Sequence, residues 1–256
     1  MFINSKIKNN IADAGFNYYV KNHVSSTNNY LDYGYIRDKA PIVILSNNQR
    51  NPRGRRGNKW VDQQNNSLCF SLCLKFNKGV NSYICLSHIV GISIIEACSS
   101  LGNNNLKLKW PNDIMQNDKK VCGILIENNI INSRIFYSMI GVGFNISIPD
   151  NLLKIIDGNP GNLKIKTEEI DLLISKIATL IVKNIETFEQ EGFTEFKNKW
   201  NRNMYALNKN IVLLSKSCDS ITGKLIGINS TGGLEIDTGA NVISIEDMTG
   251  SLRILN

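Results

Sequence analysis

The residues from Arg53 to Trp60 are those of this 256-residue chain best suited to chemistry. They read Arg-Gly-Arg-Arg-Gly-Asn-Lys-Trp, so four cations and two glycines lead into an indole. Glycine lets a backbone wrap closely around a ligand, and Arg and Lys supply donors and charge for phosphates and carboxylates. The pattern therefore predicts an anion-binding loop. Taken alone, it is equally compatible with a solvated basic loop or a nucleic-acid contact.

Four further motifs accompany this basic loop in order along the chain. Ser26-Thr27-Asn28 precedes it, and Lys-Trp-Pro-Asn-Asp at 109–113, Lys-Lys-Val-Cys-Gly-Ile-Leu-Ile-Glu at 119–127 and Gly-Val-Gly-Phe-Asn at 141–145 follow it. The ordered set resembles the biotin protein ligases, also called biotin–acetyl-CoA-carboxylase ligases, from about residue 26 to the C-terminus. Short glycine motifs recur by chance in unrelated folds, whereas five motifs in the right order are specific.

The resemblance implies an ATP-dependent, AMP-forming enzyme that converts biotin and MgATP to biotinyl-5′-AMP and pyrophosphate. A lysine of a biotin carboxyl carrier protein then takes the biotin. The expected small molecules are ATP, Mg²⁺ with the nucleotide, and biotin as substrate. The first step joins two anions, so charge neutralisation and positioning must supply most of the catalysis. Cations are therefore expected rather than a nucleophile, and His23 and His88 are interpreted as core or surface residues.

The resemblance also implies roles for individual residues. Lys120 is expected to bridge the biotin carboxylate and the α-phosphate, with Arg55 as a further catalytic cation. Asp113 is expected to orient or deprotonate the incoming lysine amine. Biotin is expected to contact Ser26, Thr27, Asn28, Gln49, Arg53, Gly54, Arg55, Lys120, Gly123, Ile124, Gly141 and Gly143. ATP is expected to contact Arg55, Arg56, Trp60, Asn112, Lys120 and Asn145, and no metal-ligating residues are predicted.

Several of these residues also have a structural interpretation. Trp60 can belong to the core at a strand start, Asp113 can cap a turn, and Ser26-Thr27-Asn28 by itself is typical of a turn or helix cap. Asn145 fits the family pattern but is also compatible with a structural role. Lys119 is interpreted as the solvated neighbour of the catalytic lysine.

Two positions depart from the family pattern. Asn51-Pro52 stands where Ala-Gly usually precedes Arg53, and Asn58 stands in place of an arginine. Proline fixes φ at about −65° and lacks an N–H, so a backbone contact or positive-φ turn there cannot be kept unchanged. Activity is expected to be retained, and the effect is expected on affinity or loop ordering. The loop has no apolar anchor between Arg53 and Lys59, which predicts ordering around a ligand.

Composition and charge bound the remaining possibilities. With 42% hydrophobic residues, the chain can bury the core of one large or two unequal domains. No apolar run has the length of a signal-peptide core or a membrane span, so a cytoplasmic location without a membrane partner is expected. The cysteines at 69, 73, 85, 98, 122 and 218 lack Cys-x-x-Cys spacing, which predicts reduced thiols and no zinc site. The net charge of +7 comes from scattered lysines in a composition typical of AT-rich coding bias, and it would still attract anionic substrates or an acidic partner.

The hydrophobic pattern predicts the elements that position these residues. Strands are predicted at 41–45, 68–74, 106–110, 123–127 and 134–142, so the basic loop joins two strands. Helices are predicted at 80–101 and from an N-cap at Thr167 to Gly192, with a short helix marked by Phe193, Phe196 and Trp200. Short β-prone segments follow at 211–214, 224–228, 234–236, 242–245 and 252–255, which predict a small β-barrel.

The predicted fold is α/β (α+β), with a mixed β-sheet and helices on one side. The resemblance implies a class II aminoacyl-tRNA-synthetase-like catalytic domain at 1–205 and an SH3-like barrel at 206–256. Only 25 residues precede Ser26, so no N-terminal DNA-binding domain and no DNA partner are expected. The oligomeric state stays open, a homodimer included.

Two other functions are compatible with parts of the pattern. A lipoate ligase or octanoyl transferase of the same superfamily would have a linear acyl pocket, and Gln49 together with Arg53-Gly54-Arg55 argues against it. A nucleic-acid-binding module would use the basic loop directly. Aromatic residues for base stacking are sparse around that loop, which argues against this second alternative.

Overall fold

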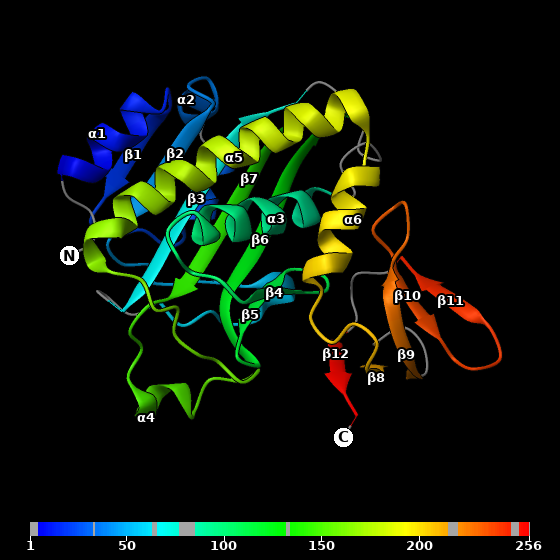
Figure 1. Cartoon of the computed structure of the whole chain (residues 1–256). Coiled ribbons are helices and arrows are strands. Elements are labelled where there is room, and N and C mark those ends of the chain that lie inside the picture. Colours follow the sequence, from blue (N-terminus) through cyan, green and yellow to red (C-terminus); the bar gives the residue numbers. More distant parts are fainter. Residues whose placement is uncertain are drawn as a thin grey trace.

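The described residues of the computed structural model form two β-sheets, the larger one covered by helices (Figure 1). These residues are 5–32, 34–62, 66–76, 85–131, 134–214, 220–246 and 251–255. The larger sheet has seven strands in the order β1-β2-β3-β7-β6-β5-β4, and the smaller has five in the order β11-β10-β9-β8-β12. A mixed sheet with helices and a second small β-unit is the predicted fold class, which is confirmed.

The larger sheet is mixed because its first strand pair is parallel. β1 (Asn17–Lys21) runs parallel to β2 (Ile42–Ser46). Antiparallel pairs then link β3 (Ser67–Lys75), β7 (Arg134–Asn145), β6 (Lys119–Ile131), β5 (Asp113–Gln116) and β4 (Leu106–Lys109). The strands predicted at 41–45, 68–74, 106–110, 123–127 and 134–142 are present as β2, β3, β4, β6 and β7.

Some of these elements differ from the prediction. β1 and β5 were not predicted, because β1 is polar and largely exposed and β5 has only four residues. Asp113 begins β5 directly after the turn at residues 110–112, and its side chain pairs with Lys120. β6 runs well beyond 123–127 because it pairs with β7 over nearly its whole length.

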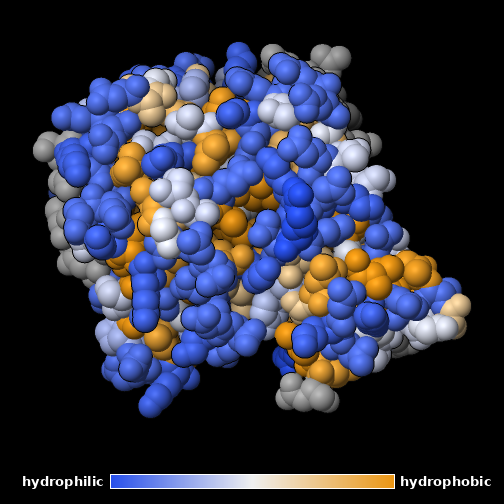
Figure 2. All heavy atoms as spheres, viewed as in Figure 1, coloured by the Kyte–Doolittle hydropathy of each residue, from blue (hydrophilic) through white to orange (hydrophobic). Residues whose placement is uncertain are grey.

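Two long helices and two shorter ones lie on one face of this sheet: α1 (Ser5–Asp13), α3 (Leu86–Ser99), α5 (Ile170–Glu191) and α6 (Thr194–Asn203). α5 buries Ile170, Ile174, Ile177 and Ile181, a spacing that gives one apolar helical face. Gly192 ends the helix at φ 80°, as predicted. The outer face of α5 contributes to the hydrophilic surface in Figure 2. In the same view, apolar side chains gather on the part of the molecule that the smaller sheet forms.

The helix starts differ from the prediction. α3 begins at Leu86, and residues 80–84 of the predicted helix lie outside the described residues. Thr167 does not cap α5: it begins the short 3-10 helix η4 (Thr167–Glu169), which has no side-chain cap, and α5 follows it. The other short helices within the described ranges are η1 (Thr27–Asp32), α2 (Gly34–Arg37), η2 (Arg55–Gly57) and α4 (Asp150–Leu153). No helix in the described part of the chain is long and apolar enough to cross a membrane.

The smaller sheet begins after α6 and is antiparallel throughout. It consists of β8 (Asn210–Leu214), β9 (Ile221–Ile228), β10 (Leu234–Asp237), β11 (Val242–Ile245) and β12 (Ser251–Ile254). All five predicted β-prone segments are therefore strands, and they stand where the SH3-like barrel is expected. The boundary at 205 and 206 stays a prediction.

Alternation along the central strands separates a core face from a pocket face. On β7, Val142 and Phe144 pack into the core with α3 and α5, and Gly141 and Gly143 point the other way. On β3, Phe70 joins the core, whereas Ser71 bonds to polar groups on the opposite face. The four larger helices thus leave the second face to the short helices η1 and α2 and to a ligand site.

Candidate functional site

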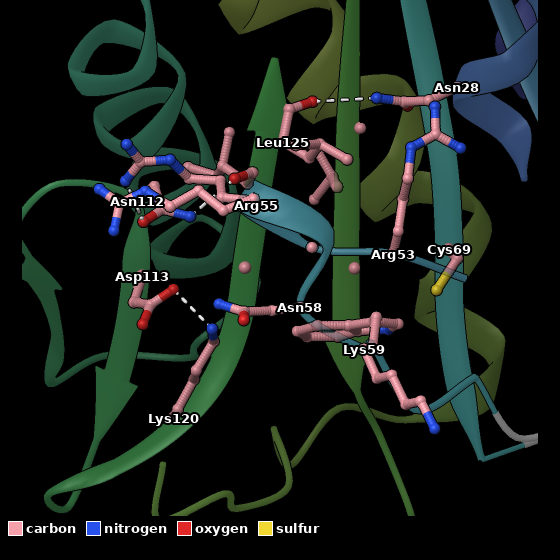
Figure 3. Close-up of a pocket in the computed structure, with 18 of the residues that line it drawn as sticks. Asn28, Arg53, Arg55, Asn58, Lys59, Cys69, Asn112, Asp113, Lys120 and Leu125 are labelled. Atoms are coloured by element: carbon pink, nitrogen blue, oxygen red, sulfur yellow. Dashed lines mark hydrogen bonds and ion pairs between the residues drawn. The ribbon is translucent and has the colours of Figure 1, made fainter. Parts of the chain in front are cut away.

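A cavity of about 240 Å³ lies on this second face of the larger sheet. Figure 3 shows its side chains in front of the strands, with the helices behind. The described lining carries six cations and one carboxylate, Asp113. The cations are Arg53, Arg55, Arg56, Lys59, Lys109 and Lys120. A cavity of this charge suits a small anionic ligand.

The structure brings nearly all of the predicted site residues to this cavity. The lining includes Ser26, Thr27, Asn28, Gln49, Arg53, Gly54, Arg55, Arg56, Trp60, Asn112, Asp113, Lys120, Gly123, Ile124, Gly141 and Gly143. Asn145 is the exception, because it is buried and its Nδ2 donates to the backbone oxygen of Lys120 at 3.2 Å. Residues spread over more than a hundred positions thus meet at one site.

Lys120 and Asp113 form an ion pair in the lining of the cavity. Their Nζ and Oδ1 atoms are 2.6 Å apart, and Figure 3 shows the two side chains pointing toward one another from β6 and β5. The Lys120 ammonium also lies 5.5 Å from the centre of the Trp60 ring. A cation held between a carboxylate and an indole is positioned before any ligand arrives.

The basic loop is folded into a short hairpin. Gly54 N–H donates to Asn58 O at 2.7 Å, and Trp60 N–H donates to Pro52 O at 3.3 Å. Pro52 therefore serves this hairpin through its carbonyl, the backbone group that proline retains. The Arg55 guanidinium donates to Asn112 Oδ1 at 3.1 Å, which ties the loop to the start of β5.

A polar cluster that the sequence reading missed anchors the start of the loop. Arg53 makes a two-pronged contact with Glu127, with Nη2 at 2.9 Å from Oε2 and 3.0 Å from Oε1. Asn28 Nδ2 donates to the same carboxylate at 2.9 Å, and Asn29 accepts from Arg53. Alternation from Gly123 along β6 puts Glu127 on the pocket face, and this signal could have identified it.

Gln49 is held by protein partners on both sides of its amide. Its Oε1 accepts from the Thr27 N–H at 2.8 Å, and its Nε2 donates to Asp62 at 3.2 Å. Burial raises the pKa of Asp62, and the hydrogen bonds from Gln49 oppose that shift. Ser71 bonds to Thr27 and Asn28 at 2.7 and 2.6 Å. Asp62 and Ser71 had no sequence signal, because neither belongs to a recognisable motif.

The glycines of the pocket face make room for large side chains. A Cβ added to Gly123 or Gly143 would lie 2.9 or 2.8 Å from the Trp60 ring. A Cβ on Gly141 would lie 2.5 Å from Asn28 Oδ1. Gly123 and Gly143, two of the three glycines expected to contact biotin, therefore make room for the Trp60 indole, which forms part of the cavity lining.

Two other features of the lining were not predicted. Lys109 lines the cavity, and burial lowers its pKa, with Lys120 and Arg253 lowering it further against Asp113. Ser251 and Leu252 of β12 also line the cavity, so the smaller sheet takes part in the site. Lys109 stands in the Lys-Trp-Pro-Asn-Asp motif, which was the available signal, whereas no pattern pointed to β12.

Nucleophilic groups near the cavity are not activated. Cys69 lines it, but burial raises the pKa of its thiol well above the usual value. His88 is fully buried against Trp200 with ring centres 4.4 Å apart, which agrees with its interpretation as a core residue. The described cysteines 69, 73, 85, 98 and 122 are buried free thiols, and Cys218 lies outside the described residues.

Comparison with known proteins agrees with this geometry. The model of the biotin/lipoate A/B protein ligase family matches residues 20–145, which contain the basic loop, Lys120 and the glycines. This matched segment supplies all of the cavity lining except Ser251 and Leu252.

Relatives and solved structures extend the likeness beyond this segment. The bifunctional ligase/repressor BirA of Escherichia coli is 28% identical over 218 residues, covering 84% of this chain and 67% of that protein. The biotin–[acetyl-CoA-carboxylase] ligase of Paracoccus denitrificans is 26% identical over 204 residues, covering 75% of this chain and 82% of that protein. The biotin protein ligase of Aquifex aeolicus in complex with biotin and ATP has a TM-score of 0.75 at 28% identity, covering 93% and 99% of the two chains.

Proposed function

We propose that the chain is a biotin protein ligase, which joins biotin to ATP as biotinyl-5′-AMP and then transfers biotin to a carrier-protein lysine. One observation carries the proposal: six cations converge on one small cavity in the segment that the biotin/lipoate ligase family model matches. The reaction must bring a carboxylate and a triphosphate together, and preorganised cations supply the needed neutralisation. Relatives named as biotin ligases support biotin as the acid.

In the first step, an oxygen of the biotin carboxylate attacks the α-phosphorus of ATP. The bond to the β-phosphate oxygen breaks, and pyrophosphate leaves with that electron pair. We assign Lys120 to an oxygen of the biotin carboxylate and an oxygen of the α-phosphate, whose negative charges the reaction brings together, because its ammonium is already held in the lining by Asp113 and Trp60. Arg55 and Arg56 are assigned to the phosphates, since the hairpin turn carries both into the lining.

In the second step, the carrier lysine amine attacks the biotinyl carbonyl and AMP leaves. Once the anionic adenylate competes for Lys120, Asp113 is free to orient the amine and accept its proton. Asp113 is also the one carboxylate of the described lining that could join Mg²⁺. One carboxylate with substrate phosphates is a ligand set that Mg²⁺ accepts, so the ion would arrive with the nucleotide.

Adenylate formation tests the proposal. The purified chain is incubated with Mg²⁺, ATP radiolabelled at the α-phosphate, and biotin, lipoate or octanoate in parallel. We expect a labelled product with biotin alone, whose mass is that of biotinyl-5′-AMP. A lipoyl or octanoyl adenylate formed in preference would assign the chain to the other branch of the superfamily.

The acceptor and setting are tested separately. With a biotin carboxyl carrier domain present, label should pass from biotin to that domain, and a carrier whose acceptor lysine is replaced by arginine should stay unlabelled. Because the reaction consumes ATP, the proposed compartment is the cytoplasm. The absence of DNA binding stays a prediction, checked by an electrophoretic shift at several salt concentrations.

A further inference from the structure

Lys120 is paired with a neighbouring strand of the larger sheet on only one side. On one side it pairs with Met115 of β5. On the other side, pairing between β6 and β7 begins only at Cys122 opposite Phe144, and β7 ends at Asn145. The β5–β6 register also shifts here, since Ile114 pairs with Cys122 and Met115 with Lys120, so Val121 is an extra residue. A β-bulge bends its strand and redirects side chains. Strand pairing alone therefore does not fix the direction in which the Lys120 side chain points.

A segment from the long connection after β7 forms backbone hydrogen bonds with Lys120 on the side that has no neighbouring strand. We call residues Asn159–Leu163 the strap. Lys120 N–H donates to Asn159 O at 2.8 Å, and Gly161 N–H donates to Lys120 O at 2.9 Å. Lys120 and Pro160 form a parallel bridge. Leu163 is fully buried, and its N–H donates to Asn145 O at 2.7 Å, which fastens the strap to the end of β7.

Two asparagine side chains complete this support. Asn159 Nδ2 donates to Asp118 O at 2.8 Å, in the turn between β5 and β6. Asn145 Nδ2 donates to Lys120 O at 3.2 Å. Both backbone groups of Lys120 are therefore bonded to residues after β6, and its side chain is left to meet Asp113 and the cavity.

Gly161 allows the strap to approach this closely. A Cβ on Gly161 would lie 2.6 Å from Lys119 Cβ and 3.0 Å from Lys119 Cδ. The backbone of Gly161 is not in the left-handed region, so its requirement is for space rather than for glycine's conformational freedom. Any larger residue must push the strap and β6 apart at Lys120.

We propose that the strap is a positioning element for Lys120, and that Gly161 is its critical residue. The inference rests on the proposed function, because it concerns the reach of the catalytic cation. Displacing the strap moves Lys120 while leaving the rest of the pocket in place. Adenylation should then slow much more than biotin binding weakens, since a small misplacement of a catalytic group is costly.

The test compares Gly161→Ala with compensating changes at Lys119, which is exposed and outside the cavity lining. Gly161→Ala should lower the rate constant of adenylate formation by on the order of tenfold to a hundredfold, with biotin affinity changed less than about threefold. Adding Lys119→Gly removes the opposing Cβ and should restore the rate. Adding Lys119→Ala retains that Cβ and should not. Lys119→Gly alone should act like the wild type.

The exchange rate of the Lys120 amide proton gives a readout that does not depend on activity. Gly161→Ala should speed it by about tenfold or more, because the bond to Asn159 O is weakened, and the Lys119→Gly double variant should restore protection. If the wild type forms no biotinyl adenylate, the proposed function fails and amide exchange still judges the strap. The strap proposal would be overturned if Gly161→Ala exchanged the Lys120 amide proton and formed adenylate at wild-type rates. It would also be overturned if adding Lys119→Ala to Gly161→Ala restored the adenylation rate as fully as adding Lys119→Gly.

Discussion

At the scale of single residues, the Lys120–Asp113 ion pair determines how the site behaves before ligand arrives. The two side chains are about one quarter exposed, so water screens the pair only in part. An anionic substrate must compete with Asp113 for the ammonium, and its arrival releases the carboxylate. One ion pair can therefore serve both half-reactions in turn, first through its cation and then through its acid.

Replacing Lys120 tests this assignment. Lys120→Ala should raise the barrier to adenylate formation by about 2–4 kcal/mol, because a preorganised donor to the developing charge is lost. Biotin binding should suffer less, since Arg53 and Arg55 remain in the lining. Pyrophosphate release in single turnovers measures the rate, with Lys119→Ala as the neighbouring control. Equal release by Lys120→Ala and wild type would remove Lys120 from the mechanism.

His88 makes the stability of the fold depend on pH. Burial lowers the pKa of His88 from its ordinary value of 6.5 to about 3. Below pH 6.5 the unfolded chain binds a proton that the folded chain does not, so stability falls as the pH drops toward 3. We expect about 2 kcal/mol to be lost from this group between about pH 7 and pH 5.

Urea unfolding at these two pH values checks the His88 prediction. His88→Phe keeps an aromatic ring beside Trp200 and should lessen the loss of unfolding free energy at the lower pH. The comparison uses the difference between the two pH values, so a uniformly less stable variant is still informative. An unchanged pH dependence in His88→Phe would assign the effect to other groups.

At the scale of elements, the basic loop owes its shape to a few backbone bonds and to the Arg53–Glu127 contact. Pro52 serves the hairpin through its carbonyl, because proline has no backbone N–H to donate. Pro52→Gly should therefore change biotin affinity by only a few-fold, while the wider conformational freedom of glycine favours opening of the unliganded loop by about 0.4–1 kcal/mol.

Two measurements check the Pro52 prediction. Limited proteolysis after Arg55 or Arg56 should be faster in Pro52→Gly without ligand and should slow when biotin and ATP are present. Calorimetric titration gives the biotin affinity. A tenfold or greater gain in affinity for Pro52→Gly would mean that the proline is a handicap and that a backbone donor is needed at this position.

The elements also mark the limit of what the sequence could predict. Five of the seven strands of the larger sheet and the C-terminal end of α5 at Gly192 follow from periodicity and glycine, and the ordered motifs identified most of the residues that line the cavity. β5 was missed because it has only four residues, and the strap was missed because its order comes from bonds to Lys120 and Asn145 rather than from its own composition. Glu127 and Asp62 were missed for a related reason: each acts through the side chain of a residue in another segment, Arg53 or Gln49.

At the scale of the whole molecule, the smaller sheet completes the cavity from outside the segment that the family model matches. Ser251 and Leu252 line it, and their position depends on how this sheet sits on the larger one. The turn before β10 connects the smaller sheet to the rest of the structure. Trp110 Nε1 donates to Gly232 O at 3.1 Å, and Cys85 Sγ donates to Thr231 O at 3.0 Å. The Trp-Pro-Asn-Asp motif thus seats the smaller sheet through Trp110 and supplies Asp113 to the cavity.

Two glycines of the smaller sheet offer a matched pair of variants to test this seating. Gly232 and Gly239 have φ of +86° and +84°, so alanine strains both backbones about equally. A Cβ on Gly232 would lie 3.0 Å from His88 Cε1, whereas nothing lies within 4 Å of a Cβ on Gly239.

Gly232→Ala should therefore shift the turn away from Trp110 and displace β12, weakening ATP binding by about three- to tenfold, the factor expected for loss of part of one pocket wall. Gly239→Ala should cost about 1 kcal/mol of stability through backbone strain and leave ATP binding unchanged. Nucleotide titration and thermal unfolding of both variants separate the two effects. If Gly239→Ala weakens ATP binding as much as Gly232→Ala, strain in the smaller sheet rather than its seating on Trp110 controls the cavity. If neither variant changes the affinity for ATP, β12 lies at the edge of the cavity without contributing to ATP binding.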